Sequence, residues 1–141
     1  MVVDLTPLSG LADALDVHHS EMVSLIGGGG KTTTLFTLGR QLAGTTVMTT
    51  TTKMGSEQTG EFPVLINPTD DALRAELTAS PKVLAWKSAG DRRADGVSAP
   101  TCDRWFGIAD NVVVEADGSR KRPFKAPADY EPVVPLSLIH I

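Results

Sequence analysis

Five short segments that are apolar or rich in β-branched residues recur along the chain. Segments of this length, bounded by polar or glycine-containing stretches, are typical of β-strands. The predicted strands cover residues 22–26, 45–50, 62–66, 82–86 and 111–115. The last of them, Asn111–Glu115, carries valine at its three central positions, as expected of a strand buried in the middle of a parallel sheet.

Between these strands, apolar residues recur at helical spacing. The first helix is predicted to begin at Thr6-Pro7, a capping residue followed by a proline, and to run to Leu15. Further helices are predicted from residue 31 to a stop at Gly44, from residues 67–71 to Pro81, and over residues 103–109. This alternation predicts an α/β fold: a mostly parallel sheet of about five strands with helices on both faces. Right-handed crossovers then bring the carboxyl ends of the strands to one edge, where ligands bind in such folds.

Two glycine-containing segments depart from this pattern. Gly39 lies inside a predicted helix, where glycine costs about 1 kcal/mol relative to alanine. Close packing of the helix against the sheet would explain it. Residues 88–100 are polar and contain glycine, so we expect a loop there that acts as a mobile flap.

Composition narrows the class of protein. With 141 residues, 41% of them apolar and 21% charged, the chain is expected to form one globular domain with a real core. The net charge of −4 argues against a nucleic-acid or anionic-membrane surface. The single cysteine, Cys102, excludes a disulfide framework and is expected to be a small buried residue. The N-terminus does not have the pattern of a signal peptide, so a cytoplasmic location is expected.

The strongest chemical signal is the glycine loop, Gly27-Gly28-Gly29-Gly30, followed by Lys31, Thr32 and Thr33. It lies between a predicted strand and a predicted helix, which is the order of a phosphate-binding loop. Glycines allow backbone N–H groups to approach an anion, and the helix adds its positive dipole end. Lys31 would supply a charge for the outer phosphates of ATP or GTP, and Thr32 a hydroxyl for Mg²⁺.

The spacing of this loop leaves two interpretations. The usual Walker pattern, Gly-x-x-x-x-Gly-Lys-Thr, would require a glycine where this chain has Leu25. The shorter spacing found here is similar to the ATP loop of the Mur ligases. A dinucleotide loop would require an acidic residue about 20 residues further on. No acidic residue occurs between Gly30 and Gly55, so a nucleoside phosphate is favoured.

A second signal follows the last predicted strand, where Glu115 and Asp117 stand two residues apart. Their strand is expected to end at the same sheet edge as the glycine loop, and the arrangement resembles a Walker B element. Mg²⁺ bound to a nucleotide usually takes one or two carboxylates. One of the two is therefore assigned to the metal and the other to the orientation of water or substrate, with their order open. With Lys31 they form the candidate catalytic set.

Two further groups are candidates for contact with phosphate or substrate. The second strand ends in four threonines and Lys53, and Thr52 and Lys53 are predicted to face the ligand. The basic run that follows Asp117 ends at Lys125, which is the member expected to point inward and to neutralise an anionic ligand.

Four segments together resemble one protein family: residues 27–33, 49–54, 114–119 and 125–135. They are similar to the YqeC-like family, and the resemblance runs from about Leu11 to Pro135. It implies nucleotide binding and an accessory role in the maturation of selenium-dependent molybdenum hydroxylases. The implied partner is such a hydroxylase or its cofactor.

The resemblance also bears on the domain boundary. Members of the family continue well past Pro135, so it implies a C-terminally truncated member. Residues 1–135 are expected to form a nucleotide-binding domain that is itself incomplete, and residues 136–141 a tail of doubtful origin.

Three functional hypotheses follow. The first is a nucleotide-binding accessory protein, with or without triphosphatase activity. The second is a Mur-like ligase or small-molecule kinase that activates an acceptor held by Thr52, Lys53 and Lys125. The third is a non-enzymatic module in which the nucleotide only orders residues 88–100.

Overall fold

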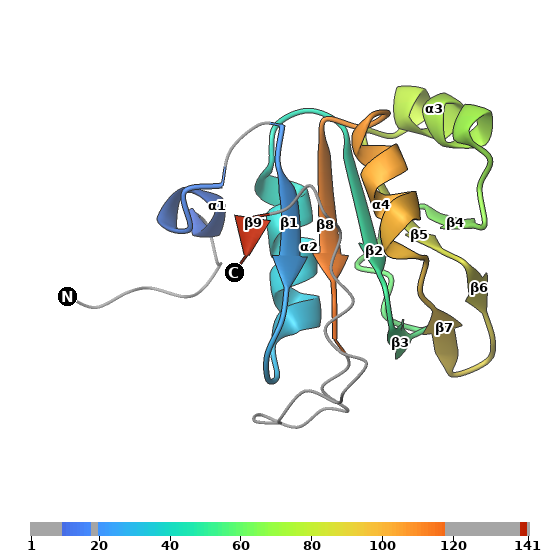
Figure 1. The fold of residues 1–141 in the computed structure, drawn as a ribbon, viewed down its shortest axis with the longest axis horizontal. Helices are drawn as coiled ribbons and strands as arrows, with labels where there is room; N and C mark the ends of the chain where they lie inside the picture. Colours follow the sequence, from blue (N-terminus) through green and yellow to red (C-terminus); the bar gives the residue numbers. More distant parts are fainter. Residues whose placement is uncertain (1–9, 18–19, 118–138, 141) are drawn as a thin grey trace.

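The computed structural model describes residues 10–17, 20–117 and 139–140, and its main feature is a six-stranded parallel sheet (Figure 1). The strand order is β4-β5-β2-β8-β1-β9. These strands are β1 (Met22–Leu25), β2 (Thr46–Thr50), β4 (Val64–Ile66), β5 (Lys82–Trp86), β8 (Asn111–Glu115) and β9 (Ile139–His140). The predicted α/β fold with a mostly parallel sheet is therefore confirmed.

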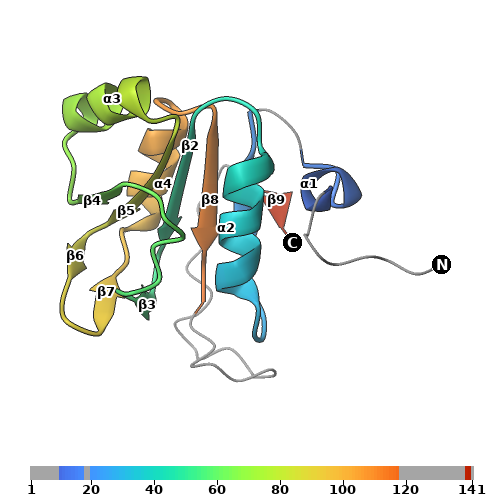
Figure 2. The ribbon, with the colours of Figure 1, turned by 180° about the vertical axis from the view of Figure 1, so that it is seen from behind.

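The described residues form four helices: α1 (Leu11–Ala14), α2 (Lys31–Gln41), α3 (Asp70–Ala79) and α4 (Ala99–Phe106). Helix α2 lies on one face and α4 on the other, as the two opposite views show (Figures 1 and 2). No helix in the described ranges is both long and apolar enough to cross a membrane.

In β2, β5 and β8, alternate side chains enter two separate cores, as the pleat of a strand requires. In β8, Val113 packs with Leu35 and Leu38 of α2, whereas Val112 and Val114 belong to the core under α3 and α4. This two-sided burial explains why the central strands are apolar at nearly every position. Gly39 confirms the expected close packing, because a Cβ atom there would collide with the sulfur of Met48 in β2.

Strand β8 is central because it pairs with both β1 and β2. In the register, Leu25 of β1 lies opposite Glu115, and Thr50 of β2 lies on the other side of the same residue. The last residue of β8 is therefore flanked by the ends of two neighbouring strands. This arrangement brings the glycine loop, which follows β1, beside the carboxylates that end β8.

A second, antiparallel sheet corrects the prediction for residues 88–100. Its order is β3-β7-β6, formed by Lys53–Gly55, Arg93–Asp95 and Ser88–Ala89. The predicted loop is therefore wrong for this segment, because most of it forms a hairpin that pairs with β3 and then enters α4. Its role as a mobile flap stays a prediction. Strands of two or three residues are too short to leave a periodic pattern in the sequence.

Several predicted boundaries also shift. Helix α4 begins at Ala99 behind the capping residue Ser98, not at residue 103. Helix α2 ends at Gln41, and the backbone of Leu42 is already extended. Gly44, with φ of 84°, therefore lies past the end of the helix and does not itself terminate it. Of the first predicted helix, the structure describes α1 (Leu11–Ala14), while Thr6 to Leu8 fall outside the described residues.

Candidate functional site

The glycine loop connects the carboxyl end of β1 to the first turn of α2. Gly27 and Gly30 have φ of 113° and 88°, values that residues with a side chain rarely adopt. Gly30 is also the N-cap of α2, and no side chain caps the helix. The first N–H groups of α2 therefore begin directly at the loop, with the positive end of the helix dipole.

Lys31 is the first residue of α2 and is only 6% exposed. Its ammonium group turns back over the loop and donates hydrogen bonds to the carbonyl oxygens of Gly27 and Gly28. It also forms an ion pair with Asp117, with Nζ 3.0 Å from Oδ1. A buried ammonium group must be paired in this way, because its desolvation is otherwise costly.

Asp117 is 1% exposed and joins the end of β8 to the loop. Its Oδ2 accepts a hydrogen bond of 3.0 Å from the backbone N–H of Gly27. Its Oδ1 is close to the ammonium of Lys31 but has no hydrogen bond of good geometry within the described part of the chain. We therefore treat the contact as ionic, and Oδ1 retains acceptor capacity.

Glu115 is the last residue of β8 and is 5% exposed. The hydroxyl of Thr32 donates a 2.9 Å hydrogen bond to its Oε2. Burial raises the pKa of this carboxyl group, and the negative charge of Asp117 acts in the same direction. The Thr32 hydrogen bond and the charge of Lys31 oppose that rise in pKa.

Backbone hydrogen bonds fix the position of both carboxylates. The N–H of Ala116 donates to the carbonyl of Leu25, at 2.9 Å, and ties β8 to the start of the glycine loop. On the other side, the N–H of Thr51 and the hydroxyl of Thr50 donate to the carbonyl of Glu115 at 3.1 and 2.8 Å. The carboxylates are thus held by rigid strands, which favours a preorganised site.

The structure brings together most of the residues selected from the sequence. Gly27, Gly28, Lys31 and Asp117 are joined by one set of contacts. Beside them, Thr32 and Glu115 form a separate hydrogen-bonded pair. Gly29 lies in the same loop, and Thr33 is exposed on the first turn of α2.

Thr52 and Lys53, which were predicted to face the ligand at the end of β2, make other contacts. Thr52 contacts Thr50, with 3.3 Å between their hydroxyl oxygens. Lys53 is 67% exposed in β3 and lies 3.7 Å from Asp95 of β7, so its described partner belongs to the second sheet and not to the glycine loop. Lys125 falls outside the described residues, as does the rest of the basic run.

The described residues outside this site give no further sign of catalytic or metal-binding chemistry. Cys102 is fully buried in α4, and burial raises the pKa of its thiol to about 12, so it is not an activated nucleophile. Within the described ranges, no three residues of the types His, Cys, Asp and Glu are grouped to hold a metal ion. A metal ion at the glycine loop would therefore need oxygen ligands of other kinds as well, for example a hydroxyl group and phosphates.

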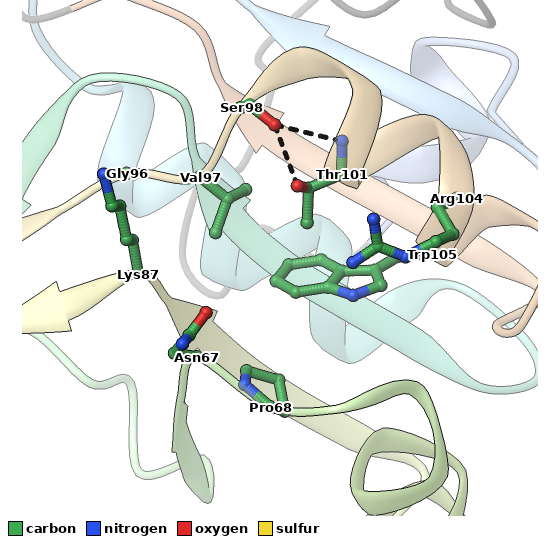
Figure 3. A pocket seen from close by; sticks show the side chains of 9 residues that line it. All are labelled: Asn67, Pro68, Lys87, Gly96, Val97, Ser98, Thr101, Arg104 and Trp105. Atoms are coloured by element: carbon green, nitrogen blue, oxygen red, sulfur yellow. Dashed lines mark hydrogen bonds between the residues drawn. The ribbon is translucent and has the colours of Figure 1, made fainter.

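Sequence reasoning did not anticipate a cleft at the other end of the sheet edge, between the start of α4 and the ends of β4 and β5 (Figure 3). Asn67 and Lys87, which line it, each directly follow a strand. That position in the sequence is the signal that could have indicated them.

The fold and the site define a class of protein: a parallel α/β domain whose glycine loop faces two buried carboxylates, one at the end of a neighbouring strand and one just beyond it. Within it, the chain belongs to the YqeC protein family, whose model matches residues 23–141. It is similar to the Uncharacterized protein YqeC of Escherichia coli (strain K12), 33% identical over 123 residues, which cover 82% of this chain and 48% of that protein. The chain thus spans about half the length of this curated relative. No solved structure matches it.

Proposed function

We propose that the chain binds a nucleoside triphosphate, ATP or GTP, together with Mg²⁺ at the glycine loop. The observation that carries this proposal is the buried Lys31, held over the loop by Gly27, Gly28 and Asp117 at the uncapped start of α2. A lysine, free N–H groups and a helix dipole that converge on one loop are suited to phosphate oxygens. Phosphate oxygens would take the place of the loop carbonyls as partners of the ammonium group.

Thr32 and Glu115 fit a Mg²⁺ ion that accompanies the phosphates. Both offer oxygen atoms, which are the ligands that Mg²⁺ prefers, and the two oxygens lie 2.9 Å apart. When bound, the ion would neutralise charge on the phosphates. Asp117 is assigned a different role, since its carboxylate already holds Lys31 and the N–H of Gly27. It would position the lysine and the loop.

The biological role proposed for this binding is assistance in the maturation of selenium-dependent molybdenum hydroxylases, in the cytoplasm. Its support is the similarity of residues 27–33, 49–54, 114–119 and 125–135 to the YqeC-like family. The partner would be the hydroxylase or its cofactor.

Ligand-dependent thermal stability tests the binding proposal. A ligand present at 100 times its Kd stabilises the folded state by about 2.7 kcal/mol. In a domain of this size, that free energy raises the Tm by roughly 5–10 °C. We expect such a rise with Mg²⁺ and ATP or GTP, and its loss in Lys31→Met/Asp117→Asn, a pair that removes the lysine without leaving Asp117 as an unpaired buried charge. Arg74→Met, which removes an exposed cation on α3, should keep the rise.

Metal dependence is measured separately. Thr32→Val and Glu115→Gln should retain binding of the nucleotide alone and lose the additional rise in Tm that Mg²⁺ produces. A rise in Tm with NAD and none with triphosphates would contradict the proposal, as would an unchanged rise in the Lys31/Asp117 double variant.

Turnover separates the functional alternatives. Phosphate release by the chain alone indicates a triphosphatase, and release that requires an added acceptor indicates a ligase or kinase. Binding without release indicates a nucleotide-gated module.

A further inference from the structure

The cleft beside α4 has a volume of about 410 Å³, which is within the range of small-molecule sites. Figure 3 shows Asn67 and Pro68, which follow β4, on one side of it, and Ser98, Thr101 and Trp105 on the other. The cleft opens at the carboxyl ends of β4 and β5, and ligands of open α/β sheets bind at that edge.

The charge of the lining is opposite to that of the whole molecule. The chain carries a net charge of −4, yet the cleft is lined by two cations, Lys87 and Arg104, and by no acidic residue. Arg104 is paired with Asp70 at 3.0 Å, outside the lining, whereas Lys87 is an exposed lysine in the lining of the cleft. Together with the amide of Asn67 and the hydroxyl of Thr101, these groups favour an anion.

The other part of the lining is apolar. Val97 and Pro68 contribute side chains, and Trp105 contributes its indole, which is only 1% exposed. The indole nitrogen of Trp105 has no hydrogen-bond partner among the residues that the structure describes. A ligand with an apolar body beside its charged group would match both parts of the lining.

The wall of the cleft is rigid on the side of the second sheet. The N–H groups of Gly96 and Val97 donate to the carbonyls of Thr52 and Thr50 at 2.6 and 2.9 Å. A Cβ atom at Gly96 would collide with the backbone of residues 50–52, so only glycine allows this approach. The cleft is therefore held in place by the end of β2, which favours a preformed site.

This cleft is separate from the glycine loop. Strand β5 is three positions away from β1 in the sheet, which at the usual strand spacing corresponds to about 14 Å. We propose that it binds a small organic anion, a carboxylate or phosphate carried on an apolar ring or chain, at the same sheet edge as the glycine loop but independently of it.

The test is a titration followed by ¹H–¹⁵N NMR, with benzoate and phenyl phosphate as probes and benzamide as the uncharged counterpart. We expect saturable shifts of the Val97, Ser98, Ala99 and Thr101 amides and of the Trp105 indole N–H with either or both anions, and weaker binding of benzamide. The relative affinities of benzoate and phenyl phosphate distinguish a carboxylate site from a phosphate site.

Substitutions inside and outside the cleft test whether Lys87 contributes to binding of the anion. Lys87→Gln should weaken binding of the preferred anion about tenfold, the usual effect of losing one charge-assisted hydrogen bond. Arg74→Gln, which removes an exposed cation outside the cleft, should change it less than twofold. In Lys31→Met/Asp117→Asn the cleft signals should shift as in the parent, so failure of nucleotide binding leaves this result unaffected.

Three outcomes would overturn the proposal. The first is the absence of saturable shifts around residues 97–101, and the second is equal binding of benzamide and the anions. The third is an equal effect of Lys87→Gln and Arg74→Gln.

Discussion

Removing the charge of Lys31 is expected to destabilise the protein even without any ligand. In Lys31→Met, Asp117 would stay 1% exposed with the N–H of Gly27 as its one remaining described donor. Breaking a buried ion pair on one side costs about 3–5 kcal/mol, because the other charge stays buried. That is a large share of the roughly 5–15 kcal/mol that stabilises an ordinary domain.

The partner substitution should cost less. Asp117→Asn retains an oxygen that can accept from Gly27, and Lys31 keeps the two carbonyl oxygens of the loop. We expect a loss of about 1–3 kcal/mol. The double variant Lys31→Met/Asp117→Asn leaves neither member of the pair as an uncompensated buried charge, so it should be more stable than Lys31→Met alone, with a coupling of about 2–3 kcal/mol.

Urea unfolding of the four proteins measures this coupling, provided that the m-value is the same for each. The matched control is the cycle of Lys53 and Asp95, an exposed pair at 3.7 Å, for which we expect a coupling below about 0.5 kcal/mol. Equal couplings in the two cycles would refute the role of the Lys31–Asp117 ion pair in holding the loop.

Two other substitutions test the strand end and the helix packing. Because burial raises the pKa of Glu115, its stabilising effect is complete below the unfolded pKa and is lost as pH rises through the folded pKa. Urea unfolding between pH 4 and 8 should therefore show Glu115→Gln gaining stability over the parent as pH rises, while Glu57→Gln, at an exposed position, shows no such trend. Gly39→Ala gains about 1 kcal/mol of helix propensity but forces a Cβ onto Met48, at a cost of about 1–3 kcal/mol, so a net loss is expected in thermal unfolding. Gly90→Ala, which meets only an ordinary contact of 3.6 Å, should not be destabilised; a stabilised Gly39→Ala would mean that the helix and strand are not in close contact.

The parallel sheet could be predicted because its strands are buried on both faces. Met22–Leu25, Thr46–Thr50, Lys82–Trp86 and Asn111–Glu115 are almost wholly buried, so each appears in the sequence as a short apolar or β-branched run. The second sheet could not be predicted in the same way. Lys53–Gly55 and Arg93–Asp95 pair across some 40 residues, and each contains a single buried side chain.

The start of α4 was recoverable from local signals. Ser98 caps the helix and Pro100 occupies its first turn, a combination typical of helix starts. The apolar residues near Trp105 favoured a later start because they are the buried part of the same helix. Local capping chemistry here was a better guide than the apolar pattern.

The residues of the candidate site could be predicted from the sequence, but the contacts that each carboxylate makes could not. Glu115 and Asp117 are two residues apart and end the same strand, so their sequence positions are nearly equivalent. Their partners differ although all of them follow β1: Glu115 meets Thr32, while Asp117 reaches Lys31 and Gly27. That distinction depends on how the glycine loop folds over the end of β8, which a single sequence does not contain.

The same strand order sets the sequence of events during synthesis. Strand β8 separates β1 from β2, and its contacts with β1 join residues about 90 positions apart, as Met22 and Val112 illustrate. Until residues 111–115 have left the ribosome, both β1 and β2 have an unpaired inner edge. Because such distant pairing is slow and leaves apolar edges exposed, the nascent chain passes through an aggregation-prone interval. The glycine loop gains its carboxylate anchors only when that interval ends, so the candidate site and the centre of the sheet are completed in one late step.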